Sequence, residues 1–131
     1  MKKSQTRRSR ASCQRSICPI ANILDIAGDK WTLLIVRDLL YFGKSRYQEL
    51  SASPEKIPTN ILADRLKRLE RDGLIVKKPY QTNPPRYAYA LTPRGVDLRS
   101  VLEAMLDWSI KHVPGTAKKR PTLKNSKTPG H

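Results

Sequence analysis

One stretch decides the fold of this chain: residues 58–73, PTNILADRLKRLERDG. At about 100° per residue on a helical wheel, Leu62, Leu66 and Leu69 fall within one narrow apolar stripe. An opposed row of polar and charged side chains follows the spacing i, i+4, i+7 and i+11: Asn60, Asp64, Lys67 and Arg71. The pattern predicts an amphipathic helix that docks on a core through its leucines and ends at Asp72-Gly73.

The polar row suits the base edges in a DNA major groove. Asn60 can pair with adenine, Asp64 can accept from the amino group of cytosine, and Lys67 can reach a guanine or a phosphate. The hydroxyl of Thr59 sits near helix N–H groups that favour a phosphate, and Ala63 is small enough for a thymine methyl contact. The alternative is that the row is only the wet face of a packing helix, because most amphipathic helices bind nothing.

Asp64 is the critical member of this row. An acid that faces a phosphate-lined groove is unfavourable unless it finds a base donor or a neighbouring cation. Lys67 and Arg68 are the two cations that its position offers. Its environment therefore decides between base reading and a merely solvated face.

The neighbouring segments favour the DNA interpretation. Expected elements are helices at 18–27, 29–42, 46–50, 58–72 and 93–113, and strands at 74–78 and 86–91. Asp29, Ser45 and Thr92 are the expected helix caps. A short helix and a loop before the quoted helix make a helix-turn-helix, and the hairpin after it makes a wing that can touch the minor groove. The predicted fold is thus mainly α with a small β-hairpin wing, a winged helix-turn-helix.

Basic residues flank the quoted helix on both sides. Arg46, at the start of the short helix, is an expected DNA contact, as are Lys77 and Arg86 of the hairpin. For Arg86 the alternative is a solvated charge at a strand end. The connection 79–85, PYQTNPP, is expected to be too long for a tight two-residue turn.

Charge is concentrated at the two ends of the chain. The protein has 131 residues and a formal net charge of +15, which fits one domain at 18–115 with a partner that is a polyanion. Residues 1–17 carry six basic groups and residues 116–131 carry five, and neither segment has an acid. Their composition predicts disordered tails. The alternative role for the tails is that of solubilising arms with weak, nonspecific affinity.

Several classes of protein find no support in the sequence. There is no apolar run of membrane-span length and no signal-peptide pattern, so we expect a cytoplasmic, nucleoid-associated protein without a membrane partner. Cys13 and Cys18 make neither a disulfide framework nor a zinc site. His112 and His131 are far apart, and phosphate loops and nucleophile elbows are absent. We therefore expect no catalytic activity, no cofactor and no metal. The stronger rival is a nonspecific architectural or RNA-binding protein driven by its tails.

Seven short motifs occur in an order and spacing that resemble the HxlR-type winged helix-turn-helix regulators, relatives of the MarR group. They are Cys18-Pro19, GDKWTLLI at 28–35, RYQEL at 46–50, IPTNILADRL at 57–66, LERDGLI at 69–75, PRYAY at 85–89 and LTPRG at 91–95. The resemblance covers roughly residues 18–113. It implies a homodimer that binds an inverted-repeat operator in double-stranded DNA and usually represses, sometimes activates. Many members have Ser where this chain has Pro58, which removes one hydroxyl from the phosphate contacts.

The last expected helix supports a dimer independently of the resemblance. Its apolar residues spread over more of the circumference than one core contact uses. We expect the interface to run through the first and last helices, with these candidates: Ile20, Leu98, Leu102, Met105, Leu106 and Trp108. The alternative is one broad face packed on its own domain.

Cys18 has two interpretations. Beside a helix N-cap, unpaired N–H groups stabilise a thiolate, and nearby Arg15 can help. Some relatives use the cysteine of this motif to sense oxidants or electrophiles, so the resemblance implies an oxidant or small-molecule effector that stays unidentified. The other interpretation is a small residue that simply tolerates the cap position.

Overall fold

The computed structural model of the chain describes residues 15–118 and 121. The expected tails, 1–17 and 116–131, therefore lie mostly outside the described residues, as does Cys13. The elements of the described part are α1 (Pro19–Ala27), α2 (Thr32–Tyr41), α3 (Tyr47–Ser51), α4 (Thr59–Arg71), β1 (Ile75–Thr82), β2 (Pro85–Leu91), α5 (Pro93–Val96) and α6 (Arg99–His112). The expectation of a mainly helical fold with one antiparallel hairpin is confirmed.

The core is built around α2. Its residues Ile35, Val36, Leu39 and Leu40 are at most 3% exposed. The same apolar cluster takes in side chains from α3, α4, the hairpin and the start of α6: Leu50, Leu62, Leu66, Leu69, Leu74, Ile75, Leu91, Leu98 and Leu102. Each fully buried leucine stabilises the fold by roughly 1.5–3 kcal/mol relative to an exposed one. The leucine stripe of α4 therefore fixes which side of that helix faces outward.

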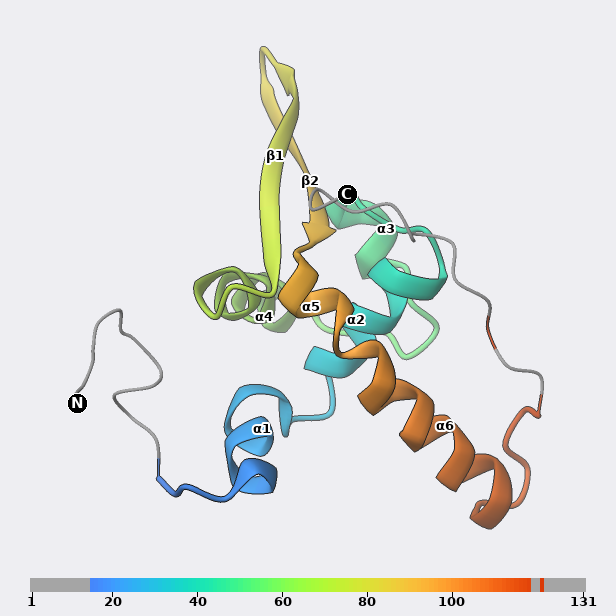
Figure 1. Cartoon of the computed structure of the whole chain (residues 1–131). Helices are drawn as coiled ribbons and strands as arrows, with labels where there is room; N and C mark the ends of the chain where they lie inside the picture. Colours follow the sequence, from blue (N-terminus) through green and yellow to red (C-terminus); the bar gives the residue numbers. More distant parts are fainter. Residues whose placement is uncertain (1–14, 119–120, 122–131) are drawn as a thin grey trace.

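The helices and the hairpin separate into two ends (Figure 1). The hairpin projects away from the body, with α4 beside its foot and α3 close to β2. At the opposite end, α1 and α6 extend away from the body. α3, its following loop and α4 form the helix-turn-helix, and the hairpin forms the wing.

The wing is longer than expected and its turn is tighter. β1 and β2 pair from Ile75 with Leu91 out to Thr82 with Pro85, so that Asn83-Pro84 alone lies between the strands. The expectation of a long connection at 79–85 was wrong. A register shift between Pro79 and Gln81 lets the ladder continue past the proline. The part of β1 beyond the expected strand is exposed, so no apolar alternation marks it in the sequence, whereas β2 at 85–91 matches the strand expected at 86–91.

The C-terminal helix expected at 93–113 is divided into α5 and α6. Thr92 caps α5 as expected, because its hydroxyl accepts a hydrogen bond from the Gly95 N–H at 3.1 Å. The chain then turns at Asp97 and Leu98 before α6 begins. α5 lies tightly against the connection between α4 and β1: a Cβ at Gly95 would come within 2.2 Å of the Leu74 carbonyl oxygen. The turn therefore follows from packing and has no local sequence signal.

Two expected helix starts also differ. α2 begins at Thr32 instead of 29, because the Asp29 carboxylate caps a turn by accepting from the Trp31 and Thr32 N–H groups at 3.1 and 3.2 Å. α3 begins after Arg46, and Ser45 is not its cap. The Glu49 side chain instead accepts from the Ser45 and Arg46 N–H groups at 2.9 and 3.0 Å, and these bonds lower the pKa of Glu49.

Candidate nucleic-acid interface

α4 divides into a buried and an exposed side as its sequence predicts. Leu62, Leu66 and Leu69 are 0%, 3% and 1% exposed. Asn60 and Lys67 are exposed on the other side. Thr59 and Arg71 are likewise exposed, and Ala63 and Asp64 are partly exposed. The helix therefore presents an edge of short polar groups in its first half and cations in its second half, as major-groove insertion requires.

The start of α4 is fixed to the start of α3. The Tyr47 hydroxyl donates a hydrogen bond of 2.9 Å to the Thr59 carbonyl oxygen. Pro58 occupies the N-cap position and supplies no capping side chain. The first N–H groups of α4 thus have no side-chain cap from the N-cap residue, an arrangement that favours an anion.

The loop between α3 and α4 is tied to α2. The Arg37 guanidinium donates to both oxygens of Glu55 at 2.8 Å, and this interaction lowers the pKa of Glu55. Ser53 donates its hydroxyl to buried Asp38. These bonds set the geometry of the loop that orients α4 relative to α3.

Asp64 finds cations within its own helix. Oδ2 of Asp64 accepts from Arg65 and lies 3.0 Å from Nε of Arg68. Arg65 in turn donates from Nε to Asp29 at 2.8 Å. Arg68 is the neighbour that the sequence offers, whereas the pairing of Arg65 with a residue 36 positions away could not be read from helical spacing.

The Asp29 carboxyl is strongly held. Burial would raise its pKa, but hydrogen bonds from Thr32, Arg65 and the Trp31 N–H outweigh burial and lower the pKa to about 2. The Asp29 side chain is 27% exposed, and the side chain of its partner Arg65 is 16% exposed. The pair joins the turn before α2 to α4 across the fold.

Arg46 lies against the wing. Its guanidinium stacks over the Tyr80 ring at 4.2 Å, and its backbone forms an isolated bridge with Ala88. Arg46 is one of the expected DNA contacts, whereas Tyr80 lies in the expected connection 79–85 and is not among them. The stack joins the first turn of the helix-turn-helix to the outer half of the wing.

The wing carries exposed cations and tyrosines. Lys77 lies over the Tyr87 ring at 4.8 Å, and Arg86 is exposed near the start of β2. A shallow groove of about 240 Å³ runs between α3 and the wing. It is lined by Tyr47, Gln48, Tyr80, Pro85, Arg86, Tyr87 and Tyr89. Aromatic faces beside guanidinium groups suit the sugars and phosphates of a nucleic acid strand.

Cys18 is exposed at the N-cap position of α1, as expected. Its N–H donates to the Ser16 hydroxyl at 3.0 Å. Arg15, the expected helper of a thiolate, instead pairs with Asp25 at 2.6 Å. This pair engages the arginine with a carboxylate of α1.

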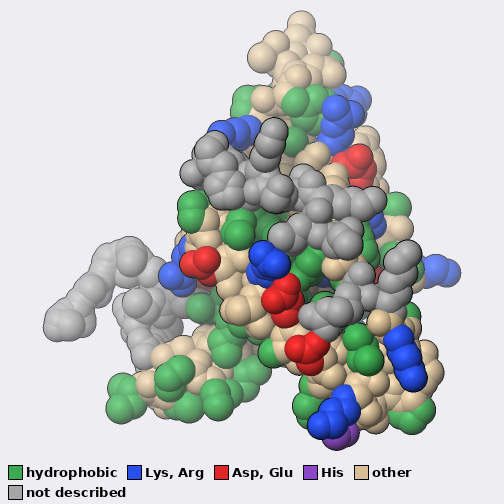
Figure 2. Space-filling model, turned by 45° about the vertical axis from the view of Figure 1, so that its right-hand side comes forward, with side chains coloured by type: hydrophobic (Ala, Val, Ile, Leu, Met, Phe, Trp, Pro, Cys, Tyr) green, Lys and Arg blue, Asp and Glu red, His purple; other side chains and the backbone are tan. Residues whose placement is uncertain are grey.

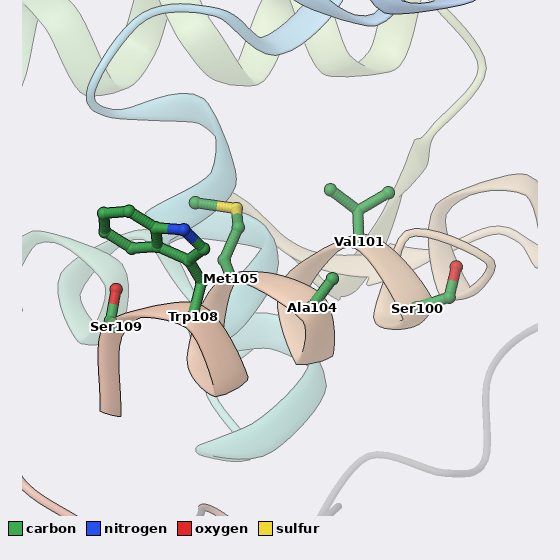
Figure 3. A pocket seen from close by; sticks show the side chains of 6 residues that line it. All are labelled: Ser100, Val101, Ala104, Met105, Trp108 and Ser109. Carbon is green, nitrogen blue, oxygen red and sulfur yellow. The ribbon is translucent and has the colours of Figure 1, made fainter. Parts of the chain in front are cut away.

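The opposite end of the molecule exposes large apolar side chains (Figure 2). On α1 and just before it, Ile17, Ile20 and Leu24 are 94%, 69% and 55% exposed. On α6, Met105 and Trp108 are 49% and 62% exposed. Figure 3 shows this shallow face of α6, lined by Ser100, Val101, Ala104, Met105, Trp108 and Ser109.

The expected dimer candidates separate into two groups. Leu98 and Leu102 are each 8% exposed and pack in the core of their own domain, so they supply no free apolar surface. Leu106 is half-buried, and Ile20, Met105 and Trp108 remain exposed. The turn between α5 and α6 accounts for this division, because it directs the start of α6 inward and its remainder away from the body.

The part of the chain that the structure describes holds neither a helix suited to a membrane nor a cluster of metal ligands. Within 15–118 and 121, none of the helices is both long and apolar enough to cross a membrane. Across the same residues, His, Cys, Asp and Glu side chains form no group of three that could hold a metal ion.

Known proteins are similar to this chain in sequence and in fold. The HxlR-like helix-turn-helix family matches residues 26–116. The HTH-type transcriptional regulator YdeP of Bacillus subtilis (strain 168) is 38% identical over 95 residues, which are 72% of this chain and 73% of YdeP. The crystal structure of PA1607 aligns with a TM-score of 0.73 and 33% identity, over 88% of this chain and 81% of PA1607. The redox regulator HypR in its reduced form aligns with a TM-score of 0.64 and 28% identity, over 74% of this chain and 95% of HypR.

Proposed function

The chain belongs to the HxlR-like helix-turn-helix family of transcriptional regulators, and on this premise we propose that it binds an inverted-repeat operator as a homodimer. The observation that carries the proposal is the division of α4 into a buried leucine stripe and an exposed polar edge. In the proposed complex α4 enters the major groove, with Thr59, Asn60, Ala63, Asp64 and Lys67 toward DNA. Arg46, Lys77 and Arg86 contact the flanking phosphates.

The homodimer is supported by the exposed apolar surfaces of α1 and α6. Exposed apolar surface of this kind is typical of protein interfaces and unfavourable in a monomer. A twofold dimer would place two α4 helices about 34 Å apart, one turn of DNA. Bound at a promoter, such a dimer would repress by occupying the DNA that polymerase needs.

Selection of bound sequences from a random DNA pool tests the proposal. The full chain should enrich an inverted repeat, and a chain trimmed to 18–115 should enrich the same repeat with lower overall affinity. Asn60→Ala should relax preference at one base pair of each half-site by ~1–3 kcal/mol, because it removes a bidentate contact. Arg71→Ala, which changes the same helix beyond its base-reading half, should lower affinity without altering preference. Enrichment of no sequence by the trimmed chain would instead support a tail-driven, nonspecific binder.

We also propose that operator binding responds to oxidants or electrophiles through Cys18. The proposal is supported by the exposed position of the thiol at the N-terminus of α1 and by the similarity to the redox regulator HypR. Diamide or a quinone should lower operator binding by the wild type. Cys18→Ser should abolish this response, and Cys13→Ser should retain it. Equal responses in Cys18→Ser and the wild type would contradict the assignment and leave Cys18 as a residue that merely tolerates the cap position.

A further inference from the structure

A chain of charged groups leads from the turn before α2 to the DNA-facing edge of α4. Asp29 accepts from the Trp31 and Thr32 N–H groups, from the Thr32 hydroxyl and from Nε of Arg65. Arg65 also donates from its Nη1 nitrogen to Asp64. One guanidinium therefore bridges two carboxylates, one of them anchored in the body and the other on the exposed row.

The bridge constrains the orientation of Asp64. Both of the cations that contact Asp64, Arg65 and Arg68, do so at the same oxygen, Oδ2. Among the described residues, the hydrogen bond to Asp64 is accepted by Oδ2, and no hydrogen bond is made to Oδ1. A carboxylate held by one oxygen, with the other oxygen free, can accept a hydrogen bond from a base in one fixed direction.

Arg65 needs its own anchor to act in this way. A guanidinium free to move beside a DNA groove would turn toward the phosphates, which compete strongly for arginine. Its pairing with Asp29 opposes that movement, and with 16% of the side chain exposed it has little freedom. The fixed turn before α2 therefore limits how Arg65 can approach Asp64.

We propose that Asp29 is a positioning residue for sequence recognition, which it serves by holding Arg65 so that Asp64 presents Oδ1 to a single base. The inference rests on the proposed DNA-reading function of α4. Asp29 itself touches no DNA in this arrangement. Its contribution is preorganisation: the acceptor is aimed before DNA arrives, so binding does not have to fix its rotamer.

The test separates this role from the capping of the turn before α2. Asn caps helices about as well as Asp, so Asp29→Asn keeps the turn and removes the charge that holds Arg65. Arg65→Lys keeps the positive charge but lacks the planar fork that bridges two carboxylates. Asp25→Asn is the matched control, because it breaks another Asp–Arg pair, with Arg15, that does not involve α4. Each full-length variant is used to select bound sequences from a random DNA pool. Asp64→Ala and the double variant Asp29→Asn/Asp64→Ala are tested in the same way.

The expected result is local to one base pair. At the base pair whose preference is relaxed by Asp64→Ala, Asp29→Asn and Arg65→Lys should relax the base preference by about 5-fold or more. Preference at the other positions should change by less than about 2-fold. The double variant should be no more relaxed there than Asp64→Ala alone, and Asp25→Asn should match the wild type. Thermal melting at neutral pH identifies any variant that has lost its fold, and the other variant of the pair then decides.

Four outcomes would overturn the inference. Asp29→Asn and Arg65→Lys could leave base preference at the Asp64-dependent position unchanged. They could also lower base preference at all positions alike, as a general structural defect would. Asp64→Ala could relax no position while the wild type still selects an operator, and the proposed function would then survive without this role for Asp29. Failure of the wild type to select any sequence would overturn the proposed function as well.

Discussion

The two ends of the molecule differ in the side chains that they expose: one end exposes charged groups that contact neighbouring side chains, and the other exposes large apolar groups. At the α4 and wing end, three charged groups have partners: Arg46 lies on Tyr80, Lys77 lies on Tyr87 and Asp64 contacts two arginines. At the α1 and α6 end, large apolar groups extend into solvent, namely Ile17, Ile20, Leu24, Met105 and Trp108.

The difference indicates two kinds of partner. Charged side chains oriented by their neighbours suit a rigid polyanion, because little conformational entropy is lost when it binds. Bare apolar side chains suit a surface of the same character, and a second copy of the chain offers one with twofold symmetry. Changes at the α4 and wing end should therefore affect DNA reading without altering assembly, and changes at the α1 and α6 end should affect assembly and, through it, DNA affinity.

The largest expected effect comes from placing a charge on the apolar end. Trp108→Glu should destabilise the proposed homodimer by about 4 kcal/mol, ~2 kcal/mol per subunit, because the twofold axis repeats the change. Sedimentation should then show monomers, and operator affinity should fall while the base preference of the residual binding persists. Phe42→Glu is the control, since Phe42 is 43% exposed but lies on neither α1 nor α6. Dimers of unchanged stability in Trp108→Glu would remove α6 from the interface.

The next effect concerns stability at the charged end. The pKa of Asp29 falls from its ordinary 3.8 to about 2 in the folded chain, so the folded state favours the ionised form. Its contribution, about 2 kcal/mol, is present above pH ~4 and is lost as pH falls through 2. Urea titrations at pH 7, 4 and 2 should show wild type and Asp29→Asn converging as the pH falls. A constant difference between them across this range would contradict the assignment, and Asp25→Asn, in an exposed pair, should shift stability by less than ~1 kcal/mol.

The sequence predicted the parts of the fold that depend on local periodicity. The leucine stripe of α4 and the apolar surface of α2 repeat at helical spacing, and Gly28 and Gly43 mark ends of helices. The outer half of β1 escaped prediction because its residues are exposed from Lys77 onward and no apolar alternation is required of them. The turn between α5 and α6 was not predicted either. It follows the close packing of Gly95 on the Leu74 carbonyl, and this tertiary contact leaves no periodic signal in the sequence.

The candidate interface was predictable to the same extent. The exposed row of α4 follows from one helix, so its members could be named from spacing alone. The groups that hold this row come from elsewhere in the chain: Asp29 reaches Arg65 from 36 residues away and Tyr47 reaches Thr59 from 12. Pairing over such separations depends on how α2, α3 and α4 pack, and no periodicity records it.

A smaller effect should follow from loosening the wing. Tyr80→Ala removes the ring under Arg46 and should weaken operator binding by about 1 kcal/mol, the value typical of a cation–π contact. Tyr80→Phe keeps the ring and should bind like the wild type. Fluorescence anisotropy with operators that differ only in the sequence under the wing measures both. Equal losses in Tyr80→Ala and Tyr80→Phe would assign the effect to the hydroxyl and not to the stack.

The smallest effect should come from two lysines that follow α6 in the sequence, Lys118 and Lys119. Lys118→Ala and Lys119→Ala should each reduce the slope of log affinity against log salt by about 0.9 if that lysine neutralises a phosphate. Base preference should stay as in the wild type, because counterion release favours binding to all sequences alike. This combination separates the two sources of affinity: α4 and the wing set which sequence is bound, whereas tail lysines add only salt-dependent strength. A changed base preference in Lys118→Ala would instead place this residue against a defined site on the DNA. Sequence recognition would then involve a residue outside α4 and the wing.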